Sequence, residues 1–180
     1  TARFFAVAGD PSQAIGPLEC LAARFRRHAY APHTHDTYVV GTIVQGCETF
    51  LIGGSRYYAG PGDLCLIDPG VVHDGAPAEE SFAYRIAYPS IGYLQGTAED
   101  AAVDTPRFAD PIVRDPELAT EFAAAHRVAE SGDALDRDER LLAVFAKLLR
   151  RHGSARARRD EAGKQERGPV ARALQYLDAH

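Results

Sequence analysis

The sequence predicts a mainly β domain followed by helices, an α+β fold in which strands fill the first two thirds of the chain. Short apolar segments separated by glycine and proline recur up to about residue 110, and this spacing is typical of a β-sandwich or β-barrel. From residue 115 onward the apolar residues recur at helical spacing, which indicates two helices. We expect these helices to form an antiparallel pair after the β region.

Six strands are expected in the β region, each built from branched, aromatic or alternating residues. Gly53-Gly54-Ser55 is a hairpin signal, because glycine accepts the positive φ angles of tight turns. Gln45-Gly46 and the segment 60–63 are expected to be further turns. The segment 38–44 is apolar on both faces, so it should be buried on both sides. The expected strands are residues 18–27, 38–44, 48–52, 56–58, 64–67 and 82–88.

The last third of the chain contains clear helix signals. Asp115 and Pro116 are a typical N-cap and first helical residue, and they predict a helix that ends near residue 130. A second helix should span residues 135–152 and stop at Gly153. Its apolar stripe must be buried against the barrel of the same chain or against a second subunit, and the sequence alone leaves both open. The stripe comprises Leu141, Leu142, Phe145, Leu148 and Leu149.

Beyond the helices the sequence predicts a linker and a new structural unit. Residues 154–167 hold no apolar residue larger than alanine, which favours a hydrated linker. Residues 168–180 begin a fresh amphipathic helix, too short to bury its apolar stripe alone. The predicted organisation is a barrel at residues 1–110, a helical pair at 111–153, a linker at 154–167 and the start of another domain at 168–180.

Composition excludes several classes of protein. The 180 residues carry a formal charge of −5, whereas a domain that neutralises DNA phosphates is normally basic. No apolar run approaches the roughly 18 residues of a membrane span, and the first ten residues turn polar too soon for a secretory signal. The three cysteines show no paired spacing, which favours free thiols in a reducing cytoplasm.

Three histidines form the most chemically suggestive pattern in the chain. His33 and His35 precede the apolar strand at 38–44, and His73 follows a turn at 68–70. Residues two apart in a strand point to the same face, so His33 and His35 should lie together, and an adjacent strand would bring His73 beside them. Three imidazoles on one wall can hold zinc or iron.

The order of these signals resembles the two motifs of the cupin barrel, a double-stranded β-helix. A closer resemblance is to the N-terminal sensing domain of AraC-type transcriptional regulators, seen in His35-Asp36-x-Tyr38, Pro69-Gly70-x-x-His73-Asp74-Gly75 and Tyr84-Arg85-x-x-Tyr88. The resemblance implies an acidic barrel that binds a small effector, a helix that supports homodimerisation, and DNA binding by a C-terminal pair of helix-turn-helix units. Residues 170–180 resemble the first helix of that DNA-binding domain, and the units themselves are not in this chain.

The sequence departs from metal-binding cupins in its carboxylates. Those proteins carry a glutamate that would fall at Val39 or Val40 here, and neither valine can bind a metal. Asp36 and Asp74 each adjoin a histidine, so in an extended strand they face away from it. A two-histidine, one-carboxylate iron site therefore lacks a carboxylate, while a three-histidine site completed by water remains open.

Two tyrosine-containing pairs have alternative interpretations. Tyr84 and Arg85 point to opposite faces of one strand; if Tyr84 packs in the core, Arg85 is expected to be an exposed surface charge. If the strand is inverted, a buried Arg85 would favour an anionic or polyhydroxy ligand. Of Tyr57 and Tyr58, one is expected in the core and one at the rim.

We therefore expect a non-enzymatic, cytoplasmic effector-binding and dimerisation domain of an AraC-type regulator. The predicted effector contacts are His33, His35, His73 and Tyr84, and no cofactor is required. One alternative is a small metal-dependent cupin enzyme, an isomerase or oxygenase, that holds a divalent metal such as zinc at the three histidines. A second is a dimerisation scaffold whose barrel is filled by its own side chains.

Overall fold

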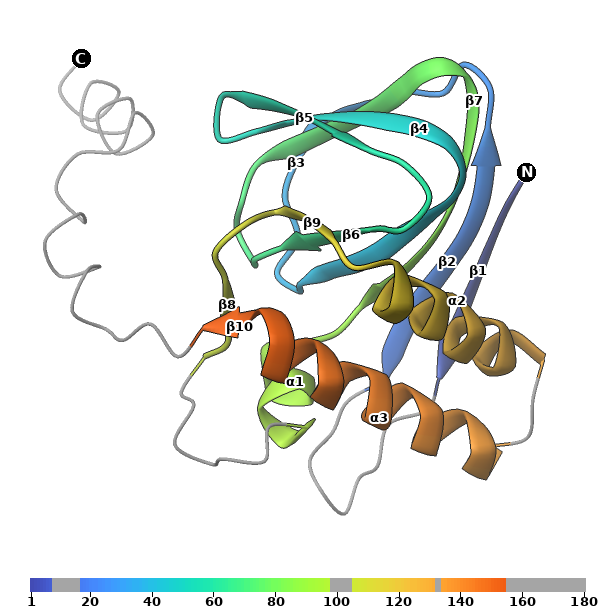
Figure 1. The fold of residues 1–180 in the computed structure, drawn as a ribbon, viewed down its shortest axis with the longest axis vertical. Helices are drawn as coiled ribbons and strands as arrows, with labels where there is room; N and C mark the ends of the chain where they lie inside the picture. Colours follow the sequence, from blue (N-terminus) through green and yellow to red (C-terminus); the bar gives the residue numbers. More distant parts are fainter. Residues whose placement is uncertain (8–16, 98–104, 132–133, 155–180) are drawn as a thin grey trace, which may run out of the picture.

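Strands occupy the first two thirds of the chain and helices the last third, so the predicted α+β class is confirmed (Figure 1). A computed structural model describes residues 1–7, 17–97, 105–131 and 134–154. The linker and the new helix expected beyond residue 154 lie outside this part of the chain. The strands are β1 Ala2–Val7, β2 Leu18–Phe25, β3 Tyr30–His33, β4 Val39–Ile52, β5 Ser55–Ala59, β6 Asp63–Ile67, β7 His73–Tyr88, β8 Arg107–Phe108, β9 Ile112–Arg114 and β10 Gly153–Ser154. The helices are α1 Ile91–Thr97, α2 Pro116–Ser131 and α3 Ala134–His152.

Two long, bent strands organise the main sheet. β4 and β7 pair antiparallel from Val40 opposite Ala87 to Ile52 opposite His73. The strand order is β1-β2-β7-β4-β6-β9, with β3 added to β7 and β5 added to β4. Because β4 and β7 bend and meet different partners at their two ends, the sheet curls into the barrel visible in Figure 1.

The turn expected at Gln45-Gly46 is wrong, because β4 continues through it as an irregular strand. Register shifts occur between Ile43 and Gln45 and between Gly46 and Glu48. Gly46 has a φ of 73°, and a Cβ there would lie 2.0 Å from the Ser81 carbonyl oxygen. The glycine therefore permits a bulge that bends the strand, not a reversal of the chain.

The apolar residues divide into two cores, one on each face of the sheet. Val39 belongs to the cluster inside the barrel, while Val40 belongs to the cluster between the barrel wall and the helices. This explains why the segment 38–44 is apolar on both faces. The inner cluster includes Phe50, Phe82 and Tyr84.

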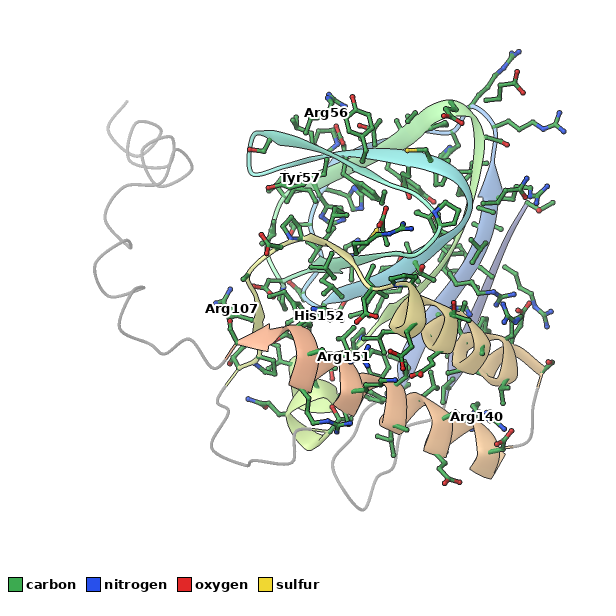
Figure 2. The ribbon with its side chains drawn as sticks, in the orientation of Figure 1. Arg56, Tyr57, Arg107, Arg140, Arg151 and His152 are labelled. Atoms are coloured by element: carbon green, nitrogen blue, oxygen red, sulfur yellow. The ribbon has the colours of Figure 1, made fainter. Side chains whose placement is uncertain are left out.

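The helix pair covers one side of the barrel wall (Figure 1). The Asp115 carboxylate accepts a hydrogen bond from the Leu118 amide at 3.1 Å, which is the predicted N-cap. Arg151 and His152 lie at the end of α3 (Figure 2). The Asp115 carboxylate also contacts these two side chains, at 3.1 and 2.9 Å. A Cβ at Gly153 would meet the Leu149 carbonyl oxygen at 2.5 Å, so glycine is needed where the helix ends.

Among the described residues, no helix is long and apolar enough to cross a membrane.

Candidate effector and metal site

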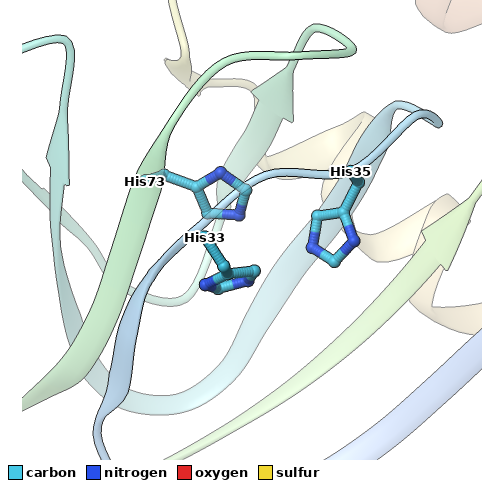
Figure 3. Close-up of side chains that lie close together, drawn as sticks. All are labelled: His33, His35 and His73. Carbon is cyan, nitrogen blue, oxygen red and sulfur yellow. The ribbon is translucent and has the colours of Figure 1, made fainter. Parts of the chain in front are cut away.

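The structure brings the three predicted histidines together at one end of the barrel. His33 ends β3 and lies directly opposite His73, the first residue of β7. His35 follows two residues beyond His33, and its ring turns toward the other two (Figure 3). The ring centroids are 4.6 to 5.4 Å apart, and one nitrogen from each ring lies within 4.8 Å of the others.

Backbone carbonyls determine which nitrogen of two of these rings carries the proton. The His33 Nδ1 lies 2.8 Å from the Ala31 oxygen, and the His73 Nδ1 lies 3.0 Å from the Val71 oxygen. A carbonyl oxygen only accepts, so each Nδ1 must donate, and in the neutral form of each ring the lone pair then lies on Nε2. Burial, followed by neighbouring imidazoles, lowers the pKa of His35 below its ordinary value; burial also lowers the pKa of His73.

These properties fit a metal ion. Zinc-binding histidines usually donate the N–H of the ring nitrogen that does not bind the metal to a backbone carbonyl or a carboxylate. Ligands of a tetrahedral zinc lie roughly 3.4 Å apart, so the rings would have to close by about 1 Å. In the described part of the chain, no carboxylate joins this cluster, in agreement with the sequence prediction. His33, His35 and His73 would hold the ion, and zinc with three such ligands can activate a water molecule.

Behind the histidines, the barrel encloses a chamber of about 50 Å³. A larger hollow of about 410 Å³ lies outside it. Tyr30, His33, His35 and Tyr88 border both spaces, so the hollow adjoins the chamber. The inner chamber is mostly apolar with a few polar groups, as is usual for small-molecule sites.

Glu48 is the residue that sequence reasoning missed. Its side chain lines the chamber and is only 3% exposed, and in the described part of the chain its Oε2 has no hydrogen-bond partner. Burial raises its pKa to about 8. Phe50 and Ile52 also point into the barrel core. Because residues two apart in a strand share a face, the apolar residues at 50 and 52 could have predicted that Glu48 points inward as well.

Gly75 provides the room that this carboxylate occupies. A Cβ on Gly75 would lie 2.7 Å from the Glu48 Oε1, which is closer than real contacts. Gly75 belongs to the Asp74-Gly75 pair of the AraC-like motif. The missing side chain at Gly75 therefore leaves room for the Glu48 carboxylate of the neighbouring strand β4.

Tyr84 faces the chamber as the sequence argument expected for a core position. It is 2% exposed, and its hydroxyl lies 2.8 Å from the Tyr30 hydroxyl. All four predicted effector contacts, His33, His35, His73 and Tyr84, line the same chamber.

Arg85 is not the exposed surface charge that was expected. Its side chain is 17% exposed and contacts the Glu130 carboxylate at 2.9 Å. It also lies 3.0 Å from the Nδ1 of His126. The physical reason is that α2 covers the outer face of β7, so both faces of this strand are occupied.

The two neighbouring tyrosines lie as predicted, one in the core and one at the rim. Tyr57 packs against the inner core, while Tyr58 is 61% exposed.

Comparison with models of known protein families shows which family this chain belongs to. The model of the AraC-like ligand binding domain matches residues 15–145, most of the chain. The chain belongs to this family. This AraC-like ligand binding domain thus has the mainly β, cupin-like architecture that the motifs indicated, followed by helices. None of the curated proteins matches its sequence.

Solved structures similar to this AraC-like domain cover about half of it. KdgF from Halomonas sp. is 23% identical over 49% of this chain and 80% of its own, with a TM-score of 0.39. A cupin superfamily protein from Desulfitobacterium hafniense is 12% identical over 50% of this chain and 78% of its own, with a TM-score of 0.41. DMSP lyase DddQ from Ruegeria pomeroyi is 20% identical over 49% of this chain and 47% of its own, with a TM-score of 0.40.

The apolar stripe of α3 in this AraC-like domain packs mainly within its own chain. Leu141, Phe145 and Leu148 are at most 1% exposed and belong to the core beneath the barrel. Of the two partners that the sequence left open for the stripe, these three residues contact the core of their own chain. Leu149 is partly buried against the same core, and Leu142 is 38% exposed.

Proposed function

We propose that this chain is the effector-sensing and dimerisation domain of a cytoplasmic AraC-type regulator, and not an enzyme. An effector bound in the barrel would control DNA binding by a helix-turn-helix domain that follows residue 168. The observation that carries the proposal is the chamber, which encloses buried polar groups in a chain of the AraC-like ligand binding family.

Strand β7 offers a route from the chamber to the helices. Tyr84 lines the chamber, and the next residue, Arg85, points to the opposite face and binds Glu130 and His126 of α2. The His126 Nε2 also donates to the Ile86 carbonyl oxygen at 2.9 Å. An effector that shifts β7 would therefore shift α2. It can change DNA affinity only if it binds one arrangement of barrel and helices more tightly than another.

The dimerisation part of the proposal rests on the outer face of α3. Leu142 is exposed there, whereas apolar residues on a helix usually find a partner. Substituting Leu142→Glu should weaken self-association in sedimentation velocity experiments, while Leu51→Glu should not. Leu51 is equally exposed at 37% but lies on β4 of the barrel. Equal effects of the two substitutions would contradict an interface on α3.

The sensing function is tested by filling the chamber. Ile43→Phe adds a ring to a residue that lines it, and Val44→Phe adds the same ring to a neighbour that is 41% exposed. A small molecule that raises the melting temperature of the wild type should also do so for Val44→Phe, but not for Ile43→Phe. The same molecule should change operator affinity of the chain extended by its DNA-binding domain. Equal operator affinity with and without every chamber ligand would refute the proposal.

A metal-dependent cupin enzyme is the second candidate, because one nitrogen from each of the three histidine rings lies within 4.8 Å of the others. Elemental analysis of protein never exposed to a nickel column discriminates between the two. Under our proposal the protein senses its effector without a bound metal. One metal ion per chain, lost in His35→Ala and accompanied by turnover, would favour the enzyme instead.

A further inference from the structure

We infer that the chamber recognises a small organic cation, a primary amine whose ammonium group binds the Glu48 carboxylate. This inference rests on the proposed sensing function and names the chemical class of the effector. Its basis is a carboxylate that is almost fully buried, directed into an internal space and, among the residues that the structure describes, without a hydrogen-bond partner at Oε2. Such a group is costly to bury unless a ligand or another residue provides a donor.

The charges around the chamber favour a cationic ligand over an anionic one. Among the described residues, no lysine or arginine lines either the chamber or the outer hollow. The second acid that lines the chamber, Asp74, already accepts a hydrogen bond from the Leu51 amide at 2.6 Å. Glu48 is therefore the acidic group that a ligand has to match, and a cation beside it would favour its ionised form.

The walls next to Glu48 suit an ammonium group. Tyr30, Tyr84 and Tyr88 all line the chamber. Burial raises the pKa of all three hydroxyls, and the nearby Glu48 charge contributes to that increase. Aromatic faces attract cations through their quadrupole, and the linked hydroxyls of Tyr30 and Tyr84 offer oxygen acceptors for the remaining N–H groups.

The inner chamber and the outer hollow also indicate the shape of the ligand. The inner chamber of about 50 Å³ has room for little more than a head group. The adjoining hollow of about 410 Å³ can take an apolar tail against Phe4, Leu21 and Tyr88. An alkyl or aryl-alkyl primary amine combines a compact cationic head with such a tail. A carboxylic acid of the same shape would place a second acidic group beside Glu48 and would bring no positive charge to favour the ionised form of Glu48.

Calorimetry with three ligands of matched shape tests the inference. Benzylamine, benzyl alcohol and benzoate differ in the charge and hydrogen bonding of the head group, and EDTA keeps metal ions away from the histidines. We expect benzylamine to bind the unmodified chain at least about tenfold more tightly than either of the others. Benzyl alcohol or benzoate binding equally well would overturn the cation assignment while leaving the sensing function intact, and absence of benzylamine binding would also overturn it.

Matched variants assign the effect to Glu48. Glu48→Gln keeps the shape and removes the charge, and it should weaken benzylamine binding about ten- to hundredfold. Glu80→Gln makes the same change at an exposed position of β7 and should leave binding unchanged. Equal benzylamine affinity of Glu48→Gln and the wild type would overturn the inference. If Glu48→Gln does not fold, the comparison of the three ligands on the unmodified chain still decides the matter.

Discussion

Replacing Glu48 with glutamine should change how the stability of this domain depends on pH. The buried carboxyl has a pKa of about 8 in the folded chain, against an ordinary value of 4.5. Between these values the folded protein keeps a proton that the unfolded chain has released. Stability contributed by this group is therefore complete below pH 4.5 and is lost as the pH rises toward 8.

The size of the effect follows from the two pKa values. Each tenfold difference in proton affinity corresponds to about 1.4 kcal/mol. Because of this difference in pKa, the free energy of unfolding is lower by about 2 kcal/mol at pH 6 and by about 4 kcal/mol at pH 8 than it is where Glu48 is protonated in both states. The glutamine variant does not titrate, so the free energy of unfolding of the wild type should fall by about 2 kcal/mol relative to the variant between these two pH values.

Urea denaturation at half-unit steps from pH 5 to pH 9 measures this difference directly. Glu80→Gln is the matched control, because Glu80 is exposed and its substitution should give a curve parallel to the wild type. Parallel curves for Glu48→Gln and the wild type across this range would show that the carboxyl is not buried without a partner. Both the chamber geometry and the ligand assignment would then need revision.

Three further predictions concern the contacts around β7 and Glu48. In a double-mutant cycle of Arg85→Met and Glu130→Gln, urea denaturation should give a coupling energy of about 1–3 kcal/mol; a value near zero would remove the link between barrel and α2. Burial lowers the pKa of His126 to about 4, so acidification from pH 6.5 to pH 4 should cost the folded state about 3 kcal/mol; His126→Gln should lack this cost. Gly75→Ala should displace the Glu48 carboxylate and weaken benzylamine binding measured by calorimetry without unfolding the domain, whereas unchanged affinity would contradict the close approach of the two residues.

Local rules accounted for most of the secondary structure. The hairpin at Gly53 and Gly54 formed because both residues adopt positive φ angles, 57° and 85°, as hairpin turns require. The N-cap at Asp115 and the stop at Gly153 also depend on neighbours within one helical turn. The strands β1, β3, β8, β9 and β10 and the helix α1 were not predicted, because their short segments carry weak periodic signals.

The convergence of His33, His35 and His73 was also predictable from the sequence. His33 and His35 share a face because side chains two apart in an extended segment point the same way. The pairing of adjacent strands then places His73 opposite His33. What the sequence alone did not supply was the tautomer of these rings, since the Ala31 and Val71 carbonyls are positioned by the backbone path.

The sequence by itself thus determined the class of fold, the place of the helices and the histidine cluster, because each depends on the period of nearby residues. Only the tertiary structure decided which side chains meet inside and outside the barrel. The bulges between Ile43 and Glu48 change which residues of β4 point into the barrel. Before the bulges the odd-numbered Val39 points inward, and after them the even-numbered Glu48 does. Likewise, Arg85 is partly buried and ion-paired because α2, more than 30 residues later in the chain, packs over β7. The direction of the β4 side chains and the burial of β7 beneath α2 both arise from contacts between distant segments, which no local pattern encodes.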